Sequence, residues 1–280
     1  MPPHEPDTPL AQVQRRHRLT VLGAGGPPML FCHGFGTDQS LWRLLAPRFG
    51  NTHQVVLMDH VGTGGSDTSA YRKERYASLD GYVEDVLEVC RVLDLRNLVY
   101  VGHSVSAMIG LRAALAEPER FACLAMVGAS PRYLEDADYH GGFTASDVEE
   151  LLEAFDLNRE VWASHLAVTA AAAPEQPWIV QEIEAQFLHA VPAILRQFAR
   201  VTFSVDDRPL LGRCPVPVLL LQSREDPIVP EAVSHYLAAG LPEAHLVFLD
   251  TAGHFAQLSA PDEVERHLRA FLANGRGARG

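Results

Sequence analysis

Short apolar runs alternate with longer segments of helical period along most of this chain. Seven runs rich in β-branched residues are strand candidates, at 19–22, 29–32, 55–58, 98–101, 123–127, 216–221 and 246–249. Between and after them, apolar residues recur at helical spacing, as in Val83, Val86, Leu87 and Cys90, and again in Val264, Leu268, Phe271 and Leu272. This alternation predicts an α/β fold with a mostly parallel sheet that helices cover on both faces.

One stretch, from about residue 131 to residue 208, contains helix candidates and no strand candidate. Ser146 and Glu149 have the spacing of a capping box, and an apolar stripe follows it, made of Val148, Leu151, Leu152 and Phe155. Pro177 and Pro192 each stand where a first helical turn would begin.

A helical insert between two strands of a parallel sheet predicts a lid over the carboxyl edge of that sheet, where ligands bind in open α/β folds. The chain then divides into a core of residues 1–130 and 209–280 and a lid of residues 131–208. The alternative is a second helical layer with no functional role.

Composition and charge narrow the class of partner. The 280 residues suit one large α/β domain or two small ones, and 47% are hydrophobic and 21% charged, which is ordinary for a globular protein. The formal net charge of -12 argues against nucleic acid or an anionic membrane as the main partner, because both require clustered lysine and arginine.

The compartment that fits the sequence is the cytoplasm. Residues 1–19 are polar and contain no apolar segment typical of a signal peptide, and no apolar run reaches the 18 residues that a membrane span needs. The four cysteines (Cys32, Cys90, Cys123 and Cys214) lie far apart in apolar elements. We therefore expect buried free thiols rather than disulfides or metal ligands.

The most specific chemical signal surrounds Ser104. An apolar strand runs directly into Gly102-His103-Ser104-Val105-Ser106, and a helix-compatible run follows. This is the context of a nucleophile elbow, a sharp strand-to-helix turn that lifts a serine hydroxyl above the sheet. Small residues must flank the serine because the strand and helix backbones approach closely there. Gly102 meets this need, and Ser106 replaces the usual second glycine.

A serine hydroxyl needs a base that an acid orients, and in this kind of fold the order along the chain is serine, acid, histidine. Asp226 follows the strand at 216–221, and His254 follows the strand at 246–249. All three groups therefore come to the same edge of the sheet. Glu225 is the alternative acid, but Asp226 before a proline turn is the better match.

Two further groups near this site have less specific roles. Asp250 lies too close to the strand that carries His254 to approach that histidine from the far side. His103 neighbours the nucleophile, and we expect its side chain to point away and to serve packing. No H-E-x-x-H or similar spacing occurs among the 13 histidines, so no metal site is predicted.

Acyl transfer also needs donors for the oxyanion that develops in the transition state. The strand at 29–32 ends in His33-Gly34-Phe35-Gly36, so the backbone N–H groups of Phe35 and Val105 are the expected pair. The alternative for the segment 33–36 is a simple glycine turn.

A second glycine-rich segment, at 59–66, lacks the spacing of a phosphate-binding loop, and a structural turn is the favoured interpretation.

Together these segments resemble the RsbQ-type α/β-hydrolases, the group that also contains the plant strigolactone and karrikin receptors. The matching segments run nearly end to end: HGFGTDQSLWR, DHVGTGGSD, LDGYVEDVLEV, VGHSVSAMIG, SPRYLEDADYHGGF, TFSVDDR, LLQSREDPIVP and GHFAQLSAP. The elbow with its second serine is itself the form found in that family.

The resemblance implies an α/β-hydrolase fold with a four-helix lid over a deep, mostly apolar pocket. It supports Ser104, Asp226 and His254 position by position. It also implies that aromatic residues line the pocket, at Phe35, Phe143, Trp162 and Phe203. The alternative for each aromatic residue is ordinary packing in the lid or core. The lid helices between 158 and 192 match the family least well.

The sequence therefore predicts a serine hydrolase that needs no cofactor and cleaves small carboxylic esters or lactones through an acyl-enzyme. The alternative is a signalling hydrolase or receptor for a small apolar ligand, acting through a regulatory protein partner, as the resemblance implies. Hydrolysis of a carbon–carbon bond by the same three residues is a weaker third option, because the lid resembles that of the RsbQ-type branch and not that of the hydrolases with this activity.

Overall fold

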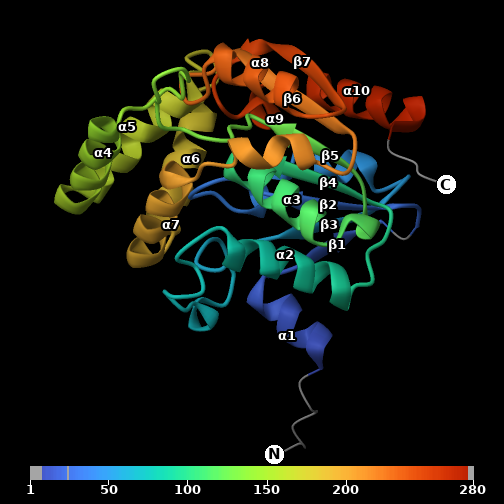
Figure 1. Cartoon of the computed structure of the whole chain (residues 1–280). Helices are drawn as coiled ribbons and strands as arrows, with labels where there is room; N and C mark the ends of the chain where they lie inside the picture. Colours follow the sequence, from blue (N-terminus) through green and yellow to red (C-terminus); the bar gives the residue numbers. More distant parts are fainter. Residues whose placement is uncertain (1–7, 24, 277–280) are drawn as a thin grey trace, which may run out of the picture.

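A seven-stranded sheet organises the computed structural model, which describes residues 8–23 and 25–276 (Figure 1). The strands lie in the order β1-β3-β2-β4-β5-β6-β7. The edge strand β1 is antiparallel to β3, and the other neighbouring pairs are parallel. The mostly parallel sheet is thus confirmed, and each of the seven apolar runs forms a strand. The strands are β1 (Thr20–Leu22), β2 (Pro28–Cys32), β3 (Gln54–Met58), β4 (Leu98–His103), β5 (Phe121–Val127), β6 (Val218–Glu225) and β7 (Ala244–Ala252).

Helices cover both faces of the sheet, and side chains alternate between the two resulting cores. In β2, Leu30 and Cys32 belong to one buried cluster, while Met29 and Phe31 belong to the other, as the two-residue period of a strand requires. The first cluster includes side chains of α2 (Asp80–Val92), α3 (Val105–Ala116) and α8 (Glu231–Gly240). The second includes side chains of α10 (Pro261–Phe271) and of two 3₁₀ turns, Gln39–Trp42 and Ala46–Phe49.

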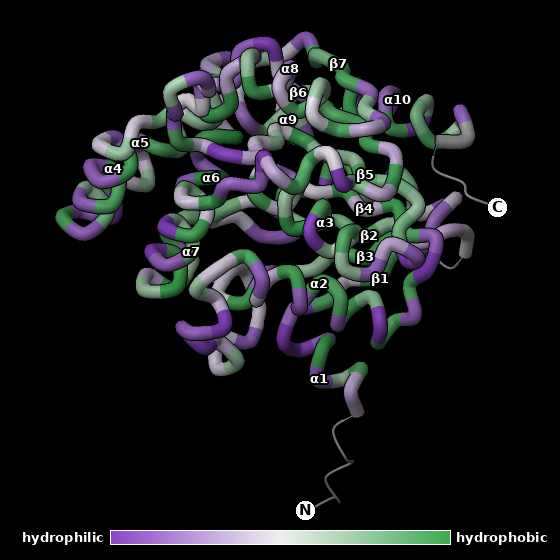
Figure 2. Tube along the Cα trace, viewed as in Figure 1, coloured by the Kyte–Doolittle hydropathy of each residue, from purple (hydrophilic) through white to green (hydrophobic). Residues whose placement is uncertain are grey.

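The central strands are apolar along their whole length because both of their faces are covered. Every residue of β4 and of β5 is buried, which matches the continuous apolar runs in the sequence. Figure 2 shows hydrophobic residues gathered on the inner strands, whereas hydrophilic segments recur along the outer helices. The helix α1 (Pro9–Arg16) packs against α2 at the edge of this arrangement.

Four helices inserted between β5 and β6 form the lid, at the left of Figure 1. They are α4 (Ala145–Leu157), α5 (Arg159–Ala171), α6 (Pro177–His189) and α7 (Pro192–Ser204). Pro177 and Pro192 open α6 and α7 as predicted. Arg159 fastens α5 to the end of α6, because its guanidinium donates hydrogen bonds to the carbonyls of Phe187 and Ala190 at 2.7 and 2.6 Å.

The predicted start of α4 was wrong by two residues. The capping box is formed by Thr144 and Asp147, not by Ser146 and Glu149. The Asp147 N–H donates to the Thr144 hydroxyl at 3.2 Å, and the Thr144 N–H donates to the Asp147 carboxylate at 2.7 Å. Thr144 is extended and can therefore cap the helix, whereas Ser146 already lies within the first turn.

Within the described residues, no helix is both long and apolar enough to cross a membrane.

Candidate active site

Ser104 occupies the sharp turn between β4 and α3 that the sequence predicts. Its backbone has φ of 56° and ψ of -126°, a conformation that costs energy in a residue with a side chain. The backbones approach closely here, since a Cβ added to Gly102 would lie 2.6 Å from the Ser106 carbonyl oxygen. The strained turn therefore requires a small residue before the serine, and it presents the hydroxyl at the carboxyl edge of the sheet.

The structure brings Ser104, His254 and Asp226 together in one hydrogen-bonded chain. His254 Nε2 lies 2.9 Å from the Ser104 hydroxyl, and His254 Nδ1 lies 2.7 Å from Asp226 Oδ2. The backbone N–H groups of Ile228 and Val229 donate to Asp226 Oδ1 at 2.8 and 3.1 Å. The carboxylate is therefore held in place. It can fix the imidazole with Nδ1 protonated and Nε2 free to accept the serine proton.

The rival acids lie elsewhere. Glu225 is the last residue of β6 and is exposed, and Asp250 is also exposed on β7. In contrast, the Asp226 side chain is only 1% exposed. The geometry thus favours Asp226 as the partner of His254.

His103 contacts His254 rather than pointing away from it. Its Nε2 lies 2.9 Å from the His254 carbonyl oxygen, and the two rings are 4.8 Å apart. Burial holds the pKa of His103 well below its usual range, so the ring is neutral and Nε2–H donates to the carbonyl. The expected packing role holds, but the prediction of its direction was wrong, because His103 supports the backbone of His254.

Tyr133 is a site residue that the sequence reasoning missed. Its hydroxyl lies 3.1 Å from the Ser104 hydroxyl, and its side chain is buried. Burial raises the pKa of Tyr133 above its usual range, so the hydroxyl keeps its proton. The available signal was the segment Ser130-Pro131-Arg132-Tyr133, which begins three residues after the end of β5 at Val127 and so at the same sheet edge as the other site residues.

The segment 33–36 passes directly beside the nucleophile. A Cβ added to Gly34 would lie 3.1 Å from the Ser104 Cβ and 2.5 Å from His103 Nδ1, so only glycine fits. Gly36 has φ of 68°. Val105 is the first residue of α3, and N–H groups of a first turn have no acceptor within the helix. Phe35 lines the same cavity as Ser104, and Val105 directly follows Ser104. The role of their N–H groups as oxyanion donors stays a prediction.

A buried hydrogen-bond network supports this segment from below. The Ser106 hydroxyl donates to the His33 carbonyl at 2.5 Å and lies 2.8 Å from His60 Nε2. The His60 N–H donates in turn to His33 Nε2 at 3.0 Å, and His33 Nδ1 lies 2.9 Å from the Gly34 carbonyl oxygen. The second serine of the elbow therefore ties α3 to the segment that carries Phe35.

The neighbouring glycine-rich segment is a structural turn, as the sequence favoured. The Asp59 carboxylate stabilises this turn, because it accepts hydrogen bonds from the N–H groups of Gln39 at 2.8 Å and Gly65 at 2.9 Å. The Ser66 hydroxyl accepts the Gly62 N–H at 3.0 Å. The N–H groups of Gly62 and Gly65 are therefore already paired within the protein.

A small cavity of about 40 Å³ adjoins Ser104 and His254. Aromatic and aliphatic side chains from the lid and the core form most of its wall, and the polar groups of the site complete it. The lining residues are Phe35, His103, Ser104, Tyr133, Leu166, Ala170, Phe187, Thr202, Phe203, Ile228, His254 and Phe255. A cavity of this size is far below the 300–1,000 Å³ of most small-molecule sites.

Of the four aromatic residues implied by the resemblance, Phe35 and Phe203 line this cavity. Phe143 packs behind Phe203, with ring centres 5.2 Å apart. Trp162 packs behind Phe35 and Phe187, at 6.5 and 5.4 Å. Trp162 also lines an outer groove of about 570 Å³ between α4 and α5. It therefore stands between that groove and the cavity.

The sequence did not identify several of the residues that line the cavity. Leu166, Ala170, Phe187 and Thr202 belong to lid helices, where apolar stripes predict burial but not the neighbour that each side chain meets. Ile228 lies two residues after the predicted acid and Phe255 directly follows the predicted histidine, and that proximity was the available hint.

Comparisons with known proteins agree with this geometry. Residues 29–267 match the model of the alpha/beta hydrolase family. The strigolactone esterase D14 of Arabidopsis thaliana is 40% identical over 91% of this chain and 95% of that protein. The karrikin insensitive 2 receptor CA of Petunia hybrida is 38% identical over 93% of this chain and 98% of that protein.

A solved structure of a hydrolase has the same fold as this chain. A hydrolase from Oleispira antarctica superposes with a TM-score of 0.91 at 33% sequence identity. The match covers 94% of this chain and 96% of that one. The similarity therefore includes the lid as well as the sheet.

Proposed function

Since the chain belongs to the α/β hydrolase family, we propose that it is a serine hydrolase of small carboxylic esters or lactones, with Ser104, His254 and Asp226 as its catalytic residues. Residues 131–208 act as the lid of a core made of residues 1–130 and 209–280, of which 1–7, 24 and 277–280 lie outside the described residues. The observation that carries the proposal is the hydrogen-bonded chain from Ser104 through His254 to Asp226, which opens into an apolar cavity.

The reaction proceeds in two halves. The Ser104 hydroxyl attacks the acyl carbon while its proton moves to His254 Nε2, and Asp226 stabilises the imidazolium. The tetrahedral intermediate then expels the alcohol, which takes the proton from His254, and an acyl-enzyme remains on Ser104. A water molecule gives a proton to His254 and attacks the acyl carbon. The bond to Ser104 breaks, and its hydroxyl regains that proton.

The backbone N–H groups of Phe35 and Val105 stabilise the oxyanion in both halves. The hydrogen-bond network of His33, His60 and Ser106 fixes the segment 33–36 against α3, and so holds the Phe35 N–H group beside the start of α3. No step of this reaction requires a metal or an organic cofactor, because the nucleophile, the base and the donors all belong to the chain.

The cavity supports a small, mostly apolar substrate. Its volume of about 40 Å³ leaves room only for a short acyl or alcohol group unless the lid helices separate. The net charge of -12 supports a neutral small molecule rather than nucleic acid or a membrane as the partner. We also keep the cytoplasm as the compartment, because all four cysteines are free and buried.

The second candidate is a receptor that signals through a protein partner. The observation that favours it is the similarity, over nearly the whole chain, to a protein named as a karrikin insensitive 2 receptor. A cavity this small also means that a larger ligand has to move the lid in order to bind, and such a movement is what a partner protein could detect.

Kinetics on a short-chain p-nitrophenyl ester distinguish the two candidates. A metabolic hydrolase gives many turnovers at a constant rate, and Ser104→Ala lowers that rate by about 10³-fold or more. A receptor gives a burst of one product equivalent followed by near-arrest. No turnover and no burst in the folded protein would contradict both, and with them the proposed role of Ser104.

A further inference from the structure

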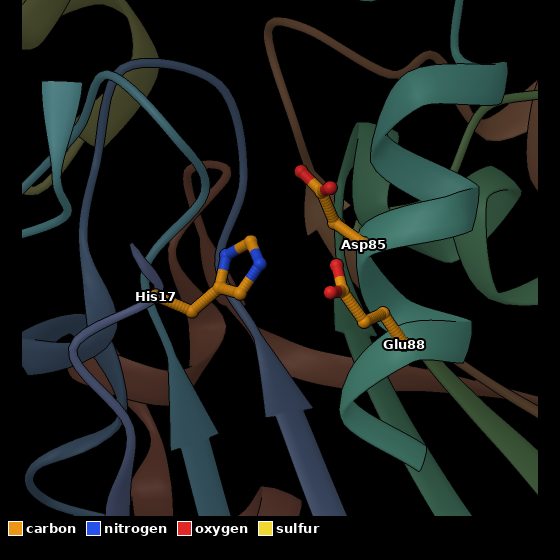
Figure 3. A group of neighbouring side chains, drawn as sticks. All are labelled: His17, Asp85 and Glu88. Carbon is orange, nitrogen blue, oxygen red and sulfur yellow. The ribbon is translucent and has the colours of Figure 1, made fainter. Parts of the chain in front are cut away.

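Three side chains outside the proposed active site converge at the contact between α1 and α2. His17 directly follows α1, while Asp85 and Glu88 lie three residues apart on α2 and so share one face of that helix. One ligand atom from each of the three residues lies within 4.8 Å of the other two. Figure 3 shows one nitrogen of the His17 ring directed at the two carboxylates.

The hydrogen bonds of His17 identify that nitrogen and its state. His17 Nδ1 lies 3.2 Å from the Asp59 carbonyl oxygen, which can only accept, so Nδ1 carries a proton. His17 is fully buried, and its Nε2 has no hydrogen-bond partner among the described residues. Burial also lowers the pKa of His17. A neutral ring with Nδ1 protonated presents a lone pair on Nε2.

This arrangement is unfavourable without a further group. A buried polar atom that makes no hydrogen bond costs free energy, and here the Nε2 lone pair also faces two negatively charged carboxylates. All three groups are acceptors in this state. A cation placed between them satisfies all three at once.

The surroundings of the carboxylates match those of metal ligands. Arg75 Nη2 and the Tyr76 hydroxyl donate to the two oxygens of Asp85 at 2.6 and 2.7 Å. Arg16 donates to Oε2 of Glu88, which leaves Oε1 available. Each of these oxygens keeps a second lone pair. Outer hydrogen bonds that orient ligating histidines and carboxylates, like that from His17 to the Asp59 carbonyl, are typical of metal sites.

We propose that His17, Asp85 and Glu88 bind a divalent transition metal ion, with Zn²⁺ as the best match, and that this ion fastens α1 to α2. One imidazole nitrogen and two carboxylate oxygens are a ligand set that zinc accepts, at about 2.0–2.2 Å. Two ligands of one tetrahedral zinc lie about 3.4 Å apart. Binding therefore draws the three side chains together by roughly 1 Å, chiefly through Glu88, whose side chain is 31% exposed.

The sequence offered no sign of this site. His17 is 68 and 71 positions away from the two acidic residues, so no short motif contains all three ligands. The site takes no part in the proposed ester hydrolysis, since none of the three side chains lines the cavity beside Ser104.

The test uses the full-length protein, stripped with a chelator and then titrated with ZnCl₂, with MgCl₂ as the comparison. We expect one equivalent of Zn²⁺ to bind, the melting temperature to rise with Zn²⁺ concentration, and amide hydrogen exchange in α1 to slow. Mg²⁺, which prefers an octahedral set of oxygen ligands, has no such effect. Esterase turnover is unchanged by the chelator.

Two variants and a matched control locate the ion. His17→Gln and Glu88→Gln should each weaken Zn²⁺ binding at least tenfold while far-UV circular dichroism and turnover stay at the level of the parent. His235→Gln removes an exposed imidazole that lies 3.2 Å from Glu231, and should leave binding unchanged. Absence of stoichiometric binding, or equal binding in parent and His17→Gln, would overturn the proposal.

Discussion

The Tyr133 hydroxyl lies 3.1 Å from the hydroxyl of Ser104, which also lies 2.9 Å from His254 Nε2. Since the serine can donate only one proton, Tyr133 donates to Ser104 when Ser104 donates to His254. The tyrosine therefore keeps the serine proton directed at the base. Burial raises the pKa of Tyr133, so the tyrosine remains a donor throughout the neutral pH range.

Replacing Tyr133 by Phe removes this donor and keeps the ring. A neutral hydrogen bond contributes about 0.5–1.5 kcal/mol, so we expect kcat for a short ester to fall about 2- to 10-fold with KM nearly unchanged. The exposed Tyr236 is the control, since Tyr236→Phe should leave both constants unchanged. A Tyr133→Phe enzyme as fast as the parent would show that the contact has no role in turnover.

Ser106 is expected to matter for both stability and rate. Ser106→Ala leaves the His33 carbonyl and His60 Nε2 buried without their partner, at a cost of about 1–3 kcal/mol for each such group. The segment that carries Phe35 also loses its tie to α3. We therefore expect a lower unfolding free energy in urea and a lower kcat/KM. If both stay at the level of the parent, the network does not position that segment.

Trp162 lines the outer groove and Leu166 lines both the groove and the cavity, so removal of the Trp162 side chain should join the two spaces. We expect Trp162→Ala to lower the unfolding free energy by about 3–5 kcal/mol, because the side chain is buried. We also expect the ratio of kcat/KM for long- to short-chain esters to rise by about 10- to 200-fold. Leu157→Ala, at an exposed position of the same groove, serves as the control. Lower stability with an unchanged ratio would reduce Trp162 to a packing role.

Buried histidines, among them His33, His60 and His103, make stability depend on pH. Burial lowers the pKa of His33, His60 and His103 from the value of about 6.5 that applies in the unfolded chain. Below pH 6.5 the unfolded chain takes up protons that the native protein refuses. The unfolding free energy therefore falls as the pH drops from 7.5 to 5.5, by up to about 1.4 kcal/mol per pH unit for each histidine. Urea unfolding at both pH values measures this, and equal stability would contradict it.

Much of the fold and the three central site residues could be predicted from the sequence, because each carries a local signal. The strands are continuous apolar runs, and Ser104, Asp226 and His254 each follow one of them at the carboxyl edge. Family membership, the α/β-hydrolase fold and the relation to the plant strigolactone and karrikin receptor group are confirmed.

The remaining features depend on how distant segments meet, and the sequence carries no local record of that. Trp162 and Phe203 both looked like pocket residues, yet only Phe203 reaches the cavity, because the packing of α5 against α6 places Trp162 one layer further out. The contact of Tyr133 with Ser104 needs the segment after β5 to fold back over the elbow. Thr144 and Ser146 both begin capping patterns, and only the backbone conformation decides between them.

A covalent serine-directed probe tests most directly whether Ser104 is the nucleophile. The folded protein is incubated with a fluorophosphonate, and intact mass and peptide mass spectra are recorded for the parent, Ser104→Ala and Ser106→Ala. We expect one adduct on the parent, mapped to Ser104, none on Ser104→Ala, and an adduct at Ser104 in Ser106→Ala. An unlabelled parent, or an adduct that persists in Ser104→Ala, would show that Ser104 is not the nucleophile.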